Sequence, residues 1–144
     1  MELSLYIGGT AKTPFELSAS FAQAMETRRM GEAVGAQGGI HSFKEFVLVK
    51  ILEELPKYKL NEYLSILAQD SAEEIFGDAE MVETADVFLE NNLNVSETAR
   101  ILFLHRNTLT YRLDKIEKQT GLNVRKFSDA VTFRLITVLL KLIK

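Results

Sequence analysis

Residues 106–111 place five side chains that can hydrogen bond to nucleic acid within one six-residue run. They are Arg106, Asn107, Thr108, Thr110 and Tyr111. Arginine and asparagine can contact a base edge through two hydrogen bonds, and hydroxyl groups can donate to phosphate oxygens. An ordinary surface helix more often carries glutamate and lysine at such positions. The residue types therefore favour contact with double-stranded DNA.

These side chains can act together only if one helix presents them on the same face. Leu109, Leu113 and Ile116 recur at the spacing of a buried helical stripe. At about 100° per residue, Asn107 and Tyr111 lie almost opposite that stripe. The residues that we expect to contact DNA on or beside the exposed face are His105, Arg106, Asn107, Thr108, Thr110, Tyr111, Arg112 and Lys115.

Arg112 and His105 could each have a role other than contact with DNA. Arg112 lies at the side of the helix, where a DNA phosphate and an acid of the same domain are equally good partners. His105 precedes the helix, and we expect it to cap the helix and contact a phosphate. No serine, aspartate or glutamate is placed around His105 as a catalytic triad requires.

A second helix is expected just before this one. Asn94 can cap it, with Glu97 at the reciprocal position of a capping box, and Ala99 is small enough for a close helix crossing. Residues 103–105 form the expected turn, with Leu104 buried at its middle. Two helices joined by a tight turn predict a helix-turn-helix at about residues 94–119, with residues 106–118 as the recognition helix in the major groove.

Charge is divided unevenly along the chain. Residues 1–99 carry 17 acidic and 7 basic side chains, whereas residues 100–144 carry 3 acidic and 10 basic ones. A basic C-terminal part is typical of a segment that meets a polyanion. A basic face that is merely solvated explains the charge alone equally well, so the pattern of residues carries the prediction.

The composition argues against several other classes of protein. The chain has no cysteine and two histidines, so we expect no enzyme, no metal site and no cofactor. No apolar run approaches the roughly 20 residues that a membrane helix needs, and the N-terminus lacks a secretory signal. We expect a cytoplasmic protein without membrane contact.

The expected fold class is mainly α. Residues 1–42 read as a strand-helix-strand segment, with strands near residues 2–7 and 39–42 and a helix capped by Thr13, with Glu16 completing a capping box. Residues 43–144 read as a helical domain that opens with a capping box at Ser42. Its expected helices cover residues 43–55, 60–68, 71–77 (capped by Ser71), 79–91, those of the helix-turn-helix, and 127–144.

The first segment buries too little surface to stand alone, because an isolated two-stranded sheet is only marginally stable. It can pack on the helical domain, pair with another chain, or belong to a larger domain inside which this segment begins. We favour the last. The long apolar helix at residues 127–144 likewise lacks cover, which favours a homodimer.

Part of the chain resembles a known family. Ala99, residues 105–109 (HRNTL) and residues 111–113 (YRL) are similar to the C-terminal helix-turn-helix of the PucR and sugar-diacid-regulator (CdaR) family of bacterial transcription factors. The turn and recognition helix also resemble Fis-type domains. The resemblance covers about residues 80–142, and residues 3–60 more loosely resemble the end of the family's GGDEF-like domain. Phe103 departs from many such motifs, which use glycine in the turn.

The resemblance and the residues together predict a sequence-specific DNA-binding transcription regulator. A small-molecule effector, if the family pattern holds, would bind outside this segment. The alternative is an interaction or sensory module whose helix-turn-helix pairs with protein and does not bind DNA. Steep weakening of DNA binding by salt separates the two.

Overall fold

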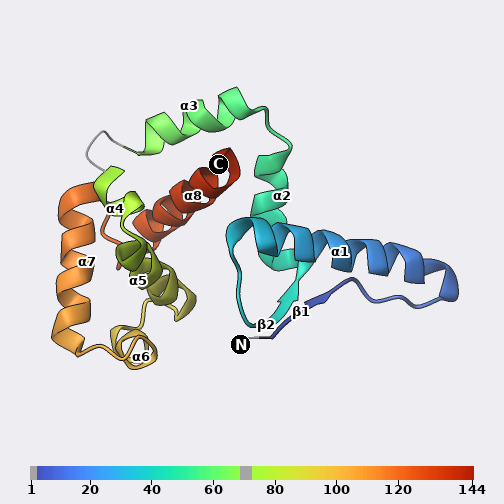
Figure 1. The fold of residues 1–144 in the computed structure, drawn as a ribbon, viewed down its shortest axis with the longest axis horizontal. Helices are drawn as coiled ribbons and strands as arrows, with labels where there is room; N and C mark the ends of the chain where they lie inside the picture. The colour runs from blue at the N-terminus through green and yellow to red at the C-terminus, as the bar shows by residue number, and fades with distance from the viewer. Residues whose placement is uncertain (1–2, 69–72) are drawn as a thin grey trace. The chain divides into compact units, whose positions relative to one another are not determined.

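The computed structural model describes residues 3–68 and 73–144 (Figure 1). These residues form two compact units. The N-terminal unit consists of residues up to Leu60 together with Lys141–Lys144, and the C-terminal unit consists of Asn61–Leu140. The segment 43–60, which we expected to open the helical domain, therefore groups with the strands.

The N-terminal unit is built around a two-stranded parallel sheet. Strand β1 (Ser4–Ile7) pairs with β2 (Gly39–Ser42), in a register that sets Ser4 opposite Gly39. Helix α1 (Leu17–Val34) connects them, as parallel pairing requires. It follows a 3-10 turn at Pro14–Glu16. The capping box expected at Thr13 is wrong, because the Thr13 side chain makes no cap and Glu16 accepts from the Lys12 N–H at 2.7 Å instead.

Gly31 permits a close approach of α1 to the sheet. A Cβ on Gly31 would lie 2.7 Å from the Tyr6 ring and 3.3 Å from the Phe46 ring. The opposite face of the sheet is open, since Leu5, Ile7 and Ile40 are all exposed. Only one face of the sheet is therefore covered within this unit.

Two further helices follow the second strand. Ser42 opens a 3-10 turn at Phe43–Phe46, and its N–H donates to the Glu45 carboxylate at 2.9 Å, as the predicted capping box requires. Helix α2 (Val47–Glu53) continues from that turn, and α3 (Lys57–Leu67) begins directly after Pro56. The cap predicted at Ser71 lies outside the described residues.

The C-terminal unit is all-helical within its described residues. Its elements are the part of α3 from Asn61 onward, α4 (Glu73–Gly77), α5 (Ala79–Glu90), α6 (Val95–Ile101), α7 (Arg106–Thr120) and α8 (Phe127–Ile143), of which the last continues past Leu140. Asp78 caps α5 by accepting from the Glu80 and Met81 N–H groups. The described residues contain no strand after residue 42, so the predicted mainly α fold with two short N-terminal strands is confirmed.

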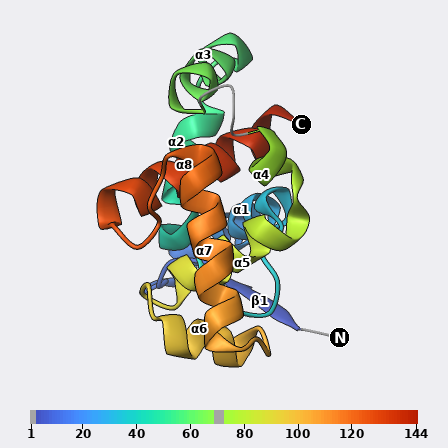
Figure 2. The ribbon, with the colours of Figure 1, turned by 90° about the vertical axis from the view of Figure 1, so that its left-hand side faces the viewer.

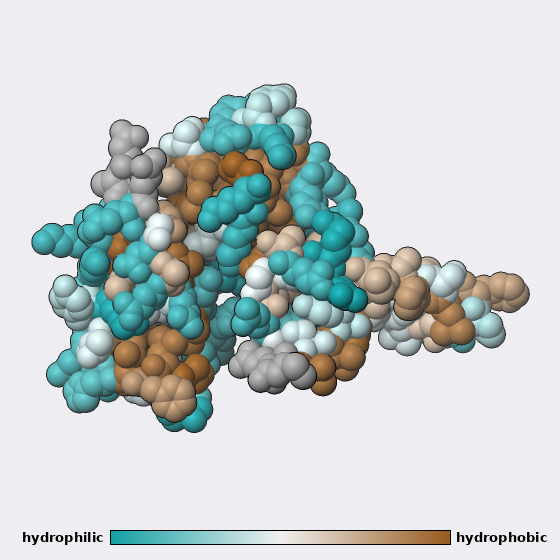
Figure 3. Space-filling model, in the orientation of Figure 1, coloured by the Kyte–Doolittle hydropathy of each residue, from teal (hydrophilic) through white to brown (hydrophobic). Residues whose placement is uncertain are grey.

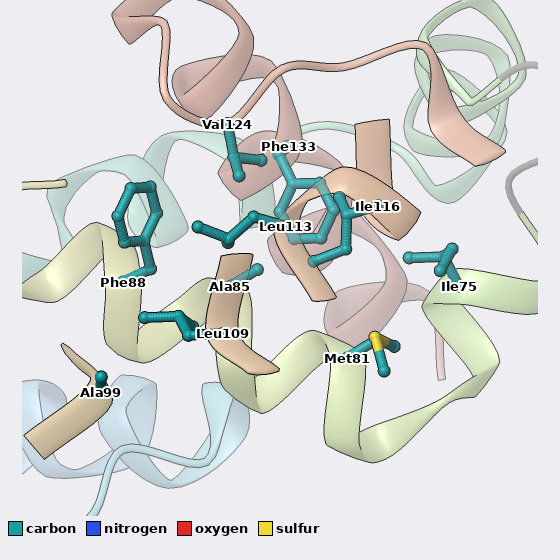
Figure 4. Packing of buried hydrophobic residues seen from close by; sticks show 10 residues of the cluster. All are labelled: Ile75, Met81, Ala85, Phe88, Ala99, Leu109, Leu113, Ile116, Val124 and Phe133. Carbon is teal, nitrogen blue, oxygen red and sulfur yellow. The ribbon is translucent and has the colours of Figure 1, made fainter. Parts of the chain in front are cut away.

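One apolar core joins these helices (Figure 4). Leu109, Leu113 and Ile116 of α7 are completely buried. They meet residues of α4, α5, α6 and α8, together with Val124 from the loop that follows α7. The residues of this cluster are Ile75, Met81, Ala85, Phe88, Ala99, Leu109, Leu113, Ile116, Val124 and Phe133. The stripe predicted from sequence is therefore the surface on which α7 packs.

Candidate DNA-binding interface

Helices α6 and α7 form the helix-turn-helix (Figure 2). Asn94 caps α6 by accepting from the Glu97 N–H at 3.0 Å. The reciprocal half of that capping box is wrong, because the Glu97 carboxylate pairs with Arg100 instead. Ala99 is buried where α6 meets α7, and Gly121 ends α7 with a left-handed φ of 72°. The predicted limits of both helices hold to within about two residues.

The turn between the helices contains an unusual aromatic residue. Phe103 has a φ of 53° and its side chain is 96% exposed. Left-handed backbone is unfavourable for a residue with a Cβ, so the backbone at Phe103 is strained where many such motifs use glycine. Leu104 is half-buried rather than fully buried as we expected. Its N–H donates to the Ala99 carbonyl oxygen at 2.9 Å, so the turn is closed by its backbone, and Leu102 rather than Leu104 packs against the core.

The outward face of α7 begins at its N-terminus. Arg106, Asn107 and Thr108 are exposed, and Tyr111 is 67% exposed. Thr110 and Lys115 are half-buried at the sides of the helix. The structure therefore brings Asn107 and Tyr111 together on the face opposite the buried stripe, as the sequence predicted.

His105 is the N-cap of α7. Its Nδ1 atom accepts a hydrogen bond from the Asn107 N–H at 3.2 Å. Because Nδ1 is the acceptor of this bond, Nε2 is the ring nitrogen that can donate to a partner outside the helix. The exposed imidazole thus offers an N–H donor beside the free backbone N–H groups that begin α7, a place that favours anions.

Arg112 differs from the other predicted contact residues. Its side chain is only 16% exposed and turns toward α5. One guanidinium nitrogen donates to Thr84 Oγ1 at 3.0 Å, and the other forms an ion pair with Glu80. The sequence left two partners open for Arg112, a DNA phosphate or an acid of the same domain. In the structure Arg112 pairs with an acid of the domain, Glu80.

Other positively charged side chains near the site are also held in ion pairs within the domain. Arg125 hydrogen bonds to Asp114 at 2.8 Å and to the Thr110 carbonyl oxygen at 3.3 Å. Arg100 binds Glu97, and this hydrogen bond holds the pKa of the Glu97 carboxyl below its usual range. Within the described part of the chain, Arg106, Lys115, Lys118 and Lys126 have no ion pair.

Two exposed features were missed by the sequence analysis. Lys118 is exposed and falls seven residues after Tyr111, so its spacing puts it in line with Asn107 and Tyr111. The same count along the helix could have identified it. Ile101 is 39% exposed and, with Phe103, makes the end of α6 apolar on its surface (Figure 3). The periodicity of α6 does not indicate this, because Ile101 is the last residue of that helix and Phe103 lies in the turn beyond it.

Among the described residues, no helix has the length and apolar character needed to cross a bilayer. Residues 81–138 match the family model of the PucR C-terminal helix-turn-helix domain. This stretch contains most of α5, both helices of the helix-turn-helix and most of α8.

Three relatives are similar to this chain over a longer stretch than the family model matches. An uncharacterised protein of Haemophilus influenzae is 33% identical over 96% of this chain and 38% of its own length. The purine catabolism regulatory protein of Bacillus subtilis is 26% identical over 92% of this chain and 25% of its own length. The carbohydrate diacid regulator of Escherichia coli is 26% identical over 85% of this chain and 32% of its own length.

The chain therefore spans well under half the length of these relatives. The similarity nevertheless agrees with the geometry, since the matched stretch contains the complete α6–turn–α7 unit. Residues 81–138 match the PucR C-terminal helix-turn-helix domain, and the purine catabolism and carbohydrate diacid regulators are among the relatives, so the comparisons support the family that the sequence resemblance indicated.

Proposed function

We propose that the chain is the DNA-binding part of a transcription regulator and that α7 reads a specific sequence from the major groove. The observation that carries the proposal is the polar, exposed face of α7, with Asn107 and Tyr111 directly opposite the buried stripe. Its role is binding, without catalysis. The related purine catabolism and carbohydrate diacid proteins are named as regulators, which supports the same role.

Each outward side chain has a distinct task in this proposal. Asn107 reads a base, most simply adenine, because a short amide can bond to its N6 and N7 atoms. Arg106, His105 and Lys118 bind phosphates, and Thr108, Thr110, Tyr111 and Lys115 fix the position of the helix on the duplex. The exposed position of all but Thr110 and Lys115, which are half-buried, supports this division.

The active form is a cytoplasmic homodimer, in which two copies read two half-sites about one helical turn apart. The open sheet face of Leu5, Ile7 and Ile40 supports further association, because it exposes apolar surface. The N-terminal unit is the end of a GGDEF-like domain, and an effector metabolite binds outside this segment.

Titration of the chain with fluorescent duplexes at several salt concentrations tests the proposal. A duplex taken from upstream of its own gene is compared with a shuffled duplex of the same composition. We expect tighter binding to the first and a logarithm of affinity that falls linearly and steeply with the logarithm of salt. Binding to neither duplex at low salt favours the alternative, a helix-turn-helix that pairs with protein.

A further inference from the structure

Arg112 is the one arginine of α7 that faces into the protein. Its guanidinium group donates to Thr84 and Glu80, which lie in the first turns of α5, 28 and 32 residues earlier in the chain. Thr84 is fully buried, and its hydroxyl also donates to the Glu80 carbonyl oxygen at 2.7 Å. The Thr84 hydroxyl that accepts from Arg112 is therefore itself held in place by the backbone of α5.

The apolar contacts of α7 constrain its rotation less sharply than hydrogen bonds do. Leu109, Leu113 and Ile116 hold α7 against the core, but the hydrophobic effect is non-directional, whereas a hydrogen bond depends on both distance and angle. A roll of about 20° on a helix of roughly 5–6 Å radius moves a side-chain tip by about 2 Å. Hydrogen bonds tolerate a spread of only about 0.5 Å in length.

Directional bonds on both flanks of α7 oppose such a roll. Arg112 ties one flank to α5 through a forked guanidinium group, whose planar geometry fixes direction. On the other flank Arg125 bonds to Asp114 and to the Thr110 carbonyl oxygen. Glu80 is 60% exposed, so its bond to Arg112 adds little to stability while still setting orientation.

We propose that Arg112, held by Glu80 and Thr84, is a positioning residue that sets the rotation of α7 and so the base preference of the domain, without touching DNA. This inference rests on the proposed function. The competing role is a phosphate contact, in which Arg112 would leave Glu80 when DNA binds. The two roles predict opposite effects of removing the Glu80 charge.

The test compares Glu80→Gln with Glu83→Gln in the full chain. Glu83 lies on the same helix, is exposed, and makes no ion pair among the described residues, so it controls for the loss of one negative charge. Relative to Glu83→Gln, we expect Glu80→Gln to bind the specific duplex about 3- to 10-fold more weakly. Binding to the shuffled duplex and the salt slope should be equal in the two variants.

Arg112→Met and Arg112→Lys complete the test once each is shown to melt as a folded protein. Positioning predicts that both lose base preference, because lysine lacks the fork, and that both keep the parent salt slope. Equal or tighter specific binding by Glu80→Gln, or a slope lowered by about 1 in Arg112→Met, overturns the inference. A parent chain that binds no DNA refutes the proposed function instead, so the two failures are distinguishable.

Discussion

At the scale of single residues, the outward face of α7 carries side chains for two kinds of proposed DNA contact, one to a base edge and one to phosphate. Asn107 is exposed and lies opposite the buried stripe, where a base edge is in reach of a helix in the major groove. Arg106 is exposed at the start of the helix, and no ion pair among the described residues competes for its charge. Specificity and electrostatic affinity can therefore be removed one at a time.

Asn107→Ala should cost about 1–3 kcal/mol on the specific duplex and relax the preference at one base position. Arg106→Ala should instead weaken binding to all duplexes alike and lower the salt slope by about 1. Binding to a set of single-base variants at three salt concentrations measures both effects. Thermal melting must first show that each variant is folded. Two folded variants with parental binding would mean that α7 is not the reading helix.

At the scale of elements, two left-handed residues bound α7 at opposite ends. Phe103 has a φ of 53° and carries a Cβ, whereas Gly121 has a φ of 72° and none. A Cβ on Gly121 would meet no atom within 4 Å, and the Phe103 side chain is almost fully exposed. Substitution at either residue therefore reports on backbone strain alone.

Phe103→Gly should raise the free energy of unfolding by about 0.5–1 kcal/mol, because relief of the strained φ exceeds the entropy that glycine adds to the unfolded chain. Gly121→Ala should lower it by about 1 kcal/mol, since alanine must adopt the left-handed conformation. Chemical denaturation of the two variants beside the parent gives both values. Shifts of the same sign would contradict this account of the two turns.

An acid-sensitive contact joins α1 and α2. Hydrogen bonds from Arg29 and Lys50 lower the pKa of Glu26 to about 2, and Arg29 also binds Glu53 at 2.6 Å. A carboxyl whose pKa is lower in the folded state stabilises the fold at neutral pH. That contribution is lost as the pH falls from the ordinary pKa of 4.5 toward 2.

Glu26→Gln should therefore lower the melting temperature at pH 7 and flatten its decline between about pH 5 and pH 2. Glu54→Gln is the control, because Glu54 is an exposed acid of the same region without an ion pair among the described residues. Melting curves across this range compare the three proteins. If the parent and Glu26→Gln lose stability in parallel on acidification, Glu26 is not the group responsible.

Which features of the site could be predicted from sequence depends on how far apart in the chain the interacting residues lie. Local signals located the helices of the site, because a cap such as Asn94 or His105 and a terminator such as Gly121 act within four residues of the chain. The partner of Arg112 could not be predicted, since Glu80 is 32 residues away. Helical angles show which side a residue takes, but only packing decides which helix lies there.

At the scale of the whole molecule, uncovered apolar surface predicts self-association. Leu5, Ile7 and Ile40 line one open face of the sheet, and Phe127 at the start of α8 is 79% exposed. Sedimentation velocity should show a dimer at concentrations of about tens of micromolar. Ile40→Lys should reduce association if the sheet face is the contact. Val131 is an exposed residue of α8, and Val131→Lys should reduce association if α8 is the contact. A parent that stays monomeric would contradict the prediction.

The central claim, that the N-terminal half of α7 lies in a groove of DNA, can be tested by directed cleavage. The chain has no cysteine, so Thr108→Cys carries a single tethered iron chelate. Glu83→Cys on α5, at an exposed acidic position, serves as the matched control. Both proteins are bound to the duplex from upstream of the gene, and the cut strands are mapped. The account predicts cuts confined to a few base pairs within the binding site for Thr108→Cys and no localised cuts for Glu83→Cys. Localised cleavage from Glu83→Cys, or none from a folded and bound Thr108→Cys, would contradict it.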